Sequence, residues 1–104
     1  MTFSVDIFSM FIDNYGDISI PLRLAHGLYI DHGVTSNVFL TSNELTQKIL
    51  DKNFFNENIN IIDIDKMDNN LLPNNNVVTI FDTQLPLSYE AKLTNKNLLI
   101  NYEY

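Results

Sequence analysis

The sequence predicts an α/β domain built on a Rossmann-like parallel sheet. Short apolar runs of strand length alternate along the chain with segments of helical periodicity, a pattern typical of parallel sheets with crossover connections. The first run shows little polar alternation, as expected for a strand covered on both faces. The chain has 104 residues, of which 45% are hydrophobic, and no repeat or linker is visible. Residues 1–104 are therefore expected to form one domain with one core.

The first strand is expected from Val5 to Ile12, and a helix follows it. Apolar residues recur at helical spacing from Asp17 onward. Asp17 can cap this helix, and Pro21 is expected in its first turn, where a missing amide proton costs least. Gly33 is expected to end the helix, because glycine readily adopts the left-handed conformation found at helix ends.

Four further strands are expected at short runs rich in Val, Ile, Leu and Phe: residues 38–40, 59–64, 77–81 and 98–100. Two further helices are expected. One covers residues 41–50 and opens with a capping box of Thr41 and Glu44, and the other covers residues 86–93 and begins at Pro86. The third crossover, around Met67 to Leu72, has little helical character.

After the last expected strand the sequence runs through Asn101-Tyr102-Glu103-Tyr104 and stops. In an α/β sheet a covering helix normally follows each strand. We therefore expect the chain to be a truncated, leading part of a larger domain.

Composition and charge exclude several classes of protein. The net charge is −7 and the six basic residues are dispersed, so a nucleic-acid backbone would be repelled. The absence of cysteine removes disulfide and thiolate chemistry. The amino-terminal apolar run is interrupted by Asp6 and Asp13 and has no basic residue before it, which argues against a signal peptide or a membrane span. A soluble, cytoplasmic protein is expected.

Cofactor and metal sites are not indicated either. Gly16 stands alone rather than in a glycine-rich phosphate loop, so a dinucleotide-dependent oxidoreductase is not supported. His26 and His32 are six residues apart and do not share a helical face, so no metal site is expected. No cofactor is expected for this chain.

The candidate site is the corner between the first strand and the first helix, Asp13-Asn14-Tyr15-Gly16-Asp17. Such a corner lies past the carboxyl edge of the sheet, where open α/β folds bind their ligands. Gly16 supplies backbone freedom for the turn. Two carboxylates and a glycine at this place predict a reactive site.

Three segments follow one another across nearly the whole chain. The first is Asp6-Ile7-Phe8 with Asp13-Asn14-Tyr15-Gly16-Asp17-Ile18 and Arg23-Leu24-Ala25 with Leu28; the second is Phe81 with Leu85-Pro86 and Tyr89; the third is Ile100-Asn101-Tyr102-Glu103-Tyr104. Together they resemble the EarP family of bacterial protein-arginine rhamnosyltransferases, which modify elongation factor P. The chain departs from the family pattern at Ser19, at Pro21-Leu22 and at Asp82-Thr83-Gln84.

The resemblance implies a GT-B glycosyltransferase, in which two Rossmann-like domains face each other across a cleft. The family transfers rhamnose from dTDP-β-L-rhamnose to an arginine with inversion at the anomeric carbon. Its second domain mainly holds the donor, whereas its first supplies catalytic aspartates and much of the surface for elongation factor P. The chain matches only the leading part of that first, acceptor-side domain, and the nucleotide-sugar domain is absent from it.

By the same resemblance, Asp17 is the general base, and Asp13 holds or orients the acceptor arginine. Asn14, Tyr15 and Gly16 shape the substrate-binding loop between them. No metal is implied. From the residues alone, without the family resemblance, Asp17 can be a helix cap and Asp13 a solvated loop residue.

Other functions remain open at this point. The isolated chain is expected to be inactive unless a second polypeptide completes it, and it can instead be a non-catalytic module that docks elongation factor P. A receiver-like signalling domain would use Asp63 or Asp65 as its phosphate acceptor, but Asn101 stands where that fold needs a lysine.

Overall fold

The computed structural model describes residues 3–9, 15–41, 44, 47–48, 58–81 and 83–103. Its centre is a five-stranded sheet in the order β3-β2-β1-β4-β5, in which every neighbouring pair is parallel. The strands are β1 (Ser4–Ser9), β2 (Thr35–Leu40), β3 (Ile59–Asp63), β4 (Asn76–Ile80) and β5 (Leu98–Tyr102). The predicted parallel α/β sheet is thus confirmed.

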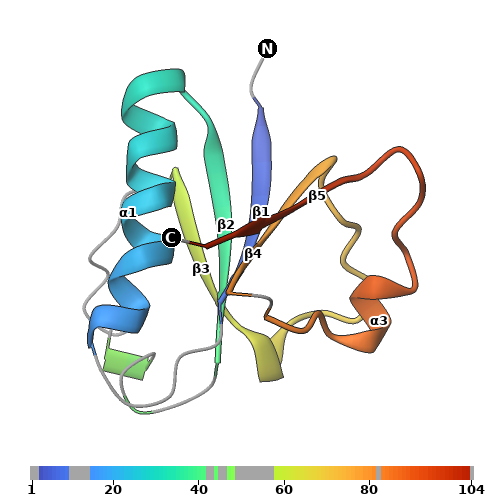
Figure 1. The fold of residues 1–104 in the computed structure, drawn as a ribbon. Coiled ribbons are helices and arrows are strands. Elements are labelled where there is room, and N and C mark those ends of the chain that lie inside the picture. Colours follow the sequence, from blue (N-terminus) through green and yellow to red (C-terminus); the bar gives the residue numbers. More distant parts are fainter. Residues whose placement is uncertain are drawn as a thin grey trace.

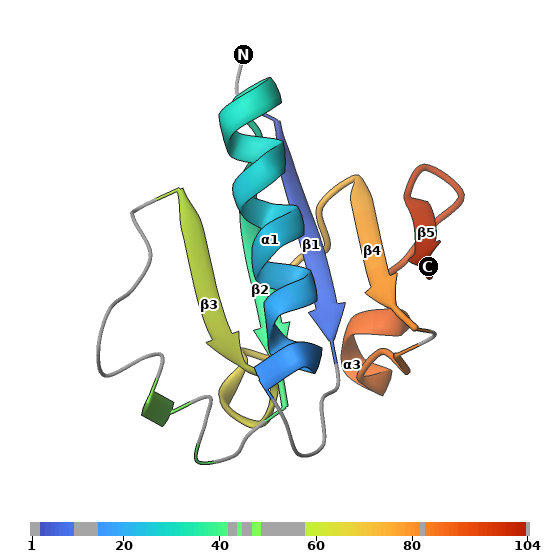
Figure 2. The same ribbon diagram turned by 60° about the vertical axis from the view of Figure 1, so that its left-hand side comes forward.

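The helical elements lie on opposite faces of the sheet. They are α1 (Tyr15–His32), the 3-10 helix η1 (Ile64–Lys66) and α3 (Leu87–Glu90). Figure 1 shows α1 on one side of the sheet and α3 on the other, and Figure 2 shows α1 running across β1 and β2. Among the described helices, none is long and apolar enough to cross a membrane.

Helix α1 begins two residues earlier than the sequence predicted. Asp17 is therefore the third helical residue rather than the cap, and Pro21 is the seventh rather than a first-turn residue. Proline has no amide proton, so the helical bond from position 21 to the carbonyl of position 17 is missing. The predicted glycine stop is confirmed, since Gly33 has φ 67° and its N–H donates to the Tyr29 carbonyl at 2.9 Å.

Other boundaries also differ from those predicted. Strand β2 begins three residues early, at Thr35, and α3 is shorter than residues 86–93. The third crossover contains only η1 and a turn, as its weak helical pattern predicted. Residues 10–12 of the expected first strand and most of the expected helix at 41–50 lie outside the described residues, although Glu44 is helical.

The sheet carries a separate core on each face, because successive strand residues point to opposite sides. Ile7 packs with Ala25 of α1 and with Val38 on one face. Phe8 packs on the other, where its ring stacks on Phe39 at 4.2 Å between centroids. This explains why β1 shows little polar alternation.

Candidate functional site

The strand order reverses between β1 and β4. The chain passes from β1 outward through β2 to β3, then returns to place β4 on the other side of β1. In open α/β sheets, ligands bind outside the carboxyl ends of the strands at such a switch point. The segments after β1 and after β4 therefore flank the candidate site. This order is that of a Rossmann half, whereas receiver-like domains have the order 2-1-3-4-5, so the receiver-like alternative is wrong.

The predicted site residues fall at this edge, as far as the structure describes them. Tyr15, Gly16 and Asp17 form the first turn of α1. For these three residues the structure describes the backbone. Asp13 and Asn14 lie outside the described residues. Since α1 is the element that follows β1 in the described order, residues 15–17 lie at the start of the first helix after the central strand.

The turn after β4 forms the opposite flank and has an unusual backbone. Phe81 has φ 50°, in the left-handed region that bulky residues rarely adopt. Its N–H donates to the Tyr102 carbonyl at 3.0 Å, and the Thr83 hydroxyl donates to the Ile80 carbonyl at 2.6 Å. These bonds fix the strained turn and leave the Phe81 side chain 47% exposed at the edge. Strain of this kind concentrates at functional sites.

Next to this turn lies a hollow of about 360 Å³, which we call the edge hollow. It is lined by residues that follow β2, β3 and β4: Thr41, Ile64, Asp65, Gln84, Leu85, Pro86 and Leu87. Its wall is mainly apolar and includes one carboxylate, that of Asp65. The hollow thus lies on the ligand-binding side of the sheet and includes Leu85-Pro86, part of the second family-like segment.

Asp6 has a role that the sequence did not reveal. This β1 residue is 1% exposed. Its carboxylate accepts hydrogen bonds from Asn37 Nδ2 at 3.0 Å, from the Asn74 N–H at 3.0 Å, from Asn74 Nδ2 at 2.6 Å and from the Tyr89 hydroxyl at 2.6 Å. A buried carboxylate is tolerated when it is hydrogen-bonded in this way. Asp6 therefore fastens β2, the segment before β4 and α3 to the central strand.

Tyr89 is the donor that joins two of the family-like segments. Its ring packs edge-on against Phe8 at 4.6 Å between centroids. Burial, followed by the hydrogen bond to Asp6 and the charge of that carboxylate, raises the pKa of the Tyr89 hydroxyl above its ordinary value of about 10. Tyr89 therefore acts as a protonated donor that holds α3 in place.

Asp63, the last residue of β3, also serves the fold. Asp63 is 4% exposed; one of its oxygens accepts from Gln47 Nε2 at 2.9 Å and the other from the Asp65 N–H at 3.0 Å, which caps η1. His26 and His32 are exposed on α1. Within the described part of the chain, no three His, Cys, Asp or Glu residues gather where they could hold a metal ion.

The strand order defines a class of protein: a Rossmann-like α/β domain, whose candidate ligand site is at the topological switch point. A family model described as Elongation-Factor P (EF-P) rhamnosyltransferase EarP matches residues 5–104. The chain therefore belongs to the EarP family, a family of glycosyltransferases that act on elongation factor P. No curated protein sequence matches the chain.

Proposed function

We propose that this chain forms the acceptor side of an inverting, GT-B type protein-arginine rhamnosyltransferase. The enzyme would transfer rhamnose from dTDP-β-L-rhamnose to an arginine of elongation factor P. The family match over residues 5–104 is the observation that carries this proposal. Residues 15–17 open the first helix after the central strand, beside which the strand order reverses, and this position supports the proposal.

The chemistry of the acceptor explains why carboxylates are needed at this corner. An arginine guanidinium has a pKa above about 12 and is a poor nucleophile while it keeps its proton. Asp13 holds the guanidinium through charge-assisted hydrogen bonds, and Asn14, Tyr15 and Gly16 shape the loop around it. Asp17 takes the proton as the guanidinium nitrogen attacks the anomeric carbon. The bond from that carbon to the nucleotide oxygen breaks, its electron pair leaves with dTDP, and the configuration inverts.

Donor binding is assigned to a second domain or a second polypeptide that faces the carboxyl edge. A cleft enzyme needs both walls to position donor and acceptor. We therefore propose that residues 1–104 alone bind elongation factor P with little or no turnover, and that no metal or other cofactor takes part. Because the acceptor is a translation factor, the reaction belongs in the cytoplasm.

The test is a transfer assay in which the chain is combined with a polypeptide that supplies the remainder of an EarP-family protein, its donor-binding domain included. Elongation factor P and dTDP-β-L-rhamnose are added, and modification of the acceptor arginine is measured by mass spectrometry. Asp17→Asn should lower the transfer rate by roughly 10²–10⁴-fold, the usual contribution of a general base. An unchanged rate in this variant contradicts the assignment of the base. Binding of elongation factor P without transfer in any combination would instead favour a non-catalytic docking module.

A further inference from the structure

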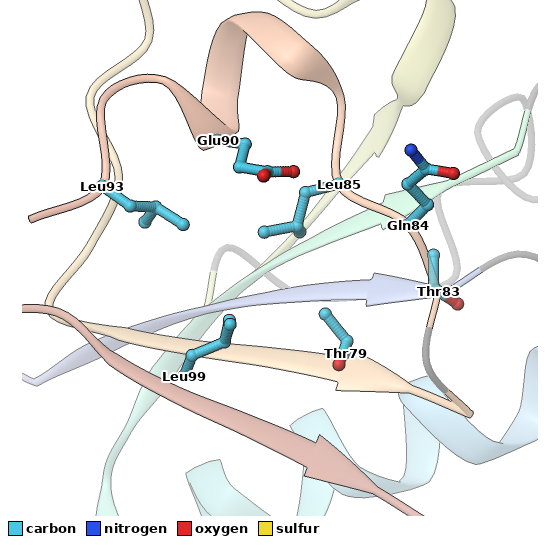
Figure 3. A pocket seen from close by; sticks show the side chains of 7 residues that line it. All are labelled: Thr79, Thr83, Gln84, Leu85, Glu90, Leu93 and Leu99. Atoms are coloured by element: carbon cyan, nitrogen blue, oxygen red, sulfur yellow. The ribbon is translucent and has the colours of Figure 1, made fainter.

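A second hollow, which we call the α3 hollow, lies on the face of the sheet that carries α3. It has a volume of about 390 Å³ and is lined by Thr79, Thr83, Gln84, Leu85, Glu90, Leu93 and Leu99. Figure 3 shows it between α3 and the strands β4 and β5. Leu85 is buried at its base, whereas Leu99 on β5 is 55% exposed. The hollow is thus an apolar recess that is open to solvent.

The Glu90 carboxylate lies over this recess. In Figure 3 the side chain extends from α3 into the space between Leu93 and Leu85. It has no hydrogen-bonding or ion-pairing partner among the residues that the structure describes. The neighbouring cation, Lys92, is engaged elsewhere, since its Nζ donates to the Asn69 carbonyl and, at 2.9 Å, to the Leu71 carbonyl. The negative charge of Glu90 is therefore not neutralised by Lys92.

The two threonine hydroxyls of the hollow bond within the protein. The Thr79 hydroxyl donates to Asn101 Oδ1 at 3.2 Å, and the Thr83 hydroxyl donates to the Ile80 carbonyl. Among the described residues of its lining, what remains for a ligand is leucine surface, the Gln84 amide at the rim and the Glu90 carboxylate. A lysine or arginine side chain has the complementary structure, an aliphatic stem that packs on apolar surface and a cationic end that pairs with a carboxylate.

We propose that the α3 hollow binds a lysine or arginine side chain of the acceptor protein, separate from the arginine that is modified. The identity of that partner rests on the proposed function. The α3 hollow shares Gln84 and Leu85 with the edge hollow, so a protein bound at the carboxyl edge would extend over both. The net charge of −7 also favours a partner that presents basic side chains. The hollow would then help to orient the acceptor protein so that the arginine to be modified reaches residues 13–17.

The experiment compares two variants that remove one negative charge each. Glu90→Gln keeps the shape of the side chain in the hollow. Asp31→Asn is the control. Asp31 is exposed near the end of α1, at the edge of the sheet where the strands begin, away from the α3 hollow. The Kd for unmodified elongation factor P is measured by calorimetry at low and at physiological salt. Thermal unfolding of each variant verifies the fold.

Glu90→Gln should weaken binding about fivefold or more at low salt, as expected for the loss of a close charge pair at an interface, and the loss should shrink as salt rises. Asp31→Asn should change the Kd by less than about twofold. Leu93→Ala, which removes the apolar wall but keeps the charge, should also weaken binding.

The remaining outcomes overturn the inference in distinguishable ways. Equal Kd values for Glu90→Gln and Asp31→Asn, with tight binding by the wild-type chain, refute the α3 hollow and leave the proposed function standing. A wild-type chain that does not bind elongation factor P refutes both.

Discussion

Different interactions stabilise the packing on the two faces of the sheet. The α1 face is mainly aliphatic: Ile7, Val38 and Leu40 pack beneath an 18-residue helix. The α3 face has an aromatic cluster beside the buried Asp6 carboxylate, beneath a helix of four residues. Because α3 is short, it leaves part of this face uncovered, and the two hollows are open there. The hydrogen bond from Tyr89 to Asp6 holds α3 in place. Both faces therefore stabilise the fold, the α1 face through apolar packing and the α3 face through a buried hydrogen-bonded carboxylate. The α3 face, with the adjoining edge, is the surface on which we propose that a partner binds.

The largest expected effect is that of Asp6→Ala, which removes the shared acceptor of the α3 face. In this variant Asn37, Asn74 and Tyr89 would lose the buried carboxylate that accepts their hydrogen bonds. The free energy of unfolding should fall by about 3–5 kcal/mol, because each donor left without its acceptor in the interior costs about 1–3 kcal/mol and these costs do not add fully. Urea denaturation measures it. A loss below about 1 kcal/mol would mean that the network does not hold this face.

The matching change on the α1 face is Leu40→Ala. Leu40 is fully buried, so the variant leaves a cavity beneath α1 and should lower the free energy of unfolding by about 3 kcal/mol. The loss should be the same at pH 7 and pH 10, because no titratable group is removed. A strong pH dependence of this loss would argue against a purely apolar role.

Tyr89→Phe isolates the bond between Tyr89 and Asp6, since the ring and its contact with Phe8 are kept. The free energy of unfolding should fall by about 2 kcal/mol at pH 7, the usual value for a hydrogen bond to a charged group. Burial raises the pKa of Tyr89 in the folded state. The unfolded chain therefore loses this proton first, and above pH of about 10 wild-type stability should decline by up to about 1.4 kcal/mol per pH unit from this group. Identical high-pH slopes for the variant and the wild type would exclude this coupling.

The smallest effect is expected at the sheet edge. Leu99 is 55% exposed on β5, and Leu99→Thr keeps a residue that favours strands. Stability should change by less than about 0.5 kcal/mol, whereas binding of elongation factor P should weaken if Leu99 contributes to the α3 hollow. Denaturation and calorimetry on the same preparation separate the two effects. A large loss of stability would show that Leu99 belongs to the core rather than to a binding surface.

Local sequence patterns predicted the strands and the glycine cap, because these depend on neighbours along the chain. The start of α1 was misplaced, since Asp17 fits equally well as a cap or as a first-turn residue. The role of Asp6 could not be predicted from spacing, because Asn74 and Tyr89 are 68 and 83 residues away along the chain. An acid inside an otherwise apolar run was the available signal.

The candidate site was predicted on one flank only. The corner at residues 13–17 could be placed from the strand-to-helix transition. That Leu85-Pro86 follows a strand at the same edge of the sheet depends on β4 pairing with β1. Strand order is not encoded in local periodicity. The family-like spacing of Leu85-Pro86 and Tyr89 indicated that the second segment matters without indicating where it lies.

The central claim is that the carboxyl edge and the adjoining α3 face receive elongation factor P. The most direct measurement is a titration of the isotope-labelled chain with unmodified elongation factor P, followed through backbone amide NMR shifts. We predict the largest shifts at residues 15–17 and 83–93. Shifts centred on the exposed side of α1, around Arg23 and His26, or at the opposite edge near Gly33, would contradict it.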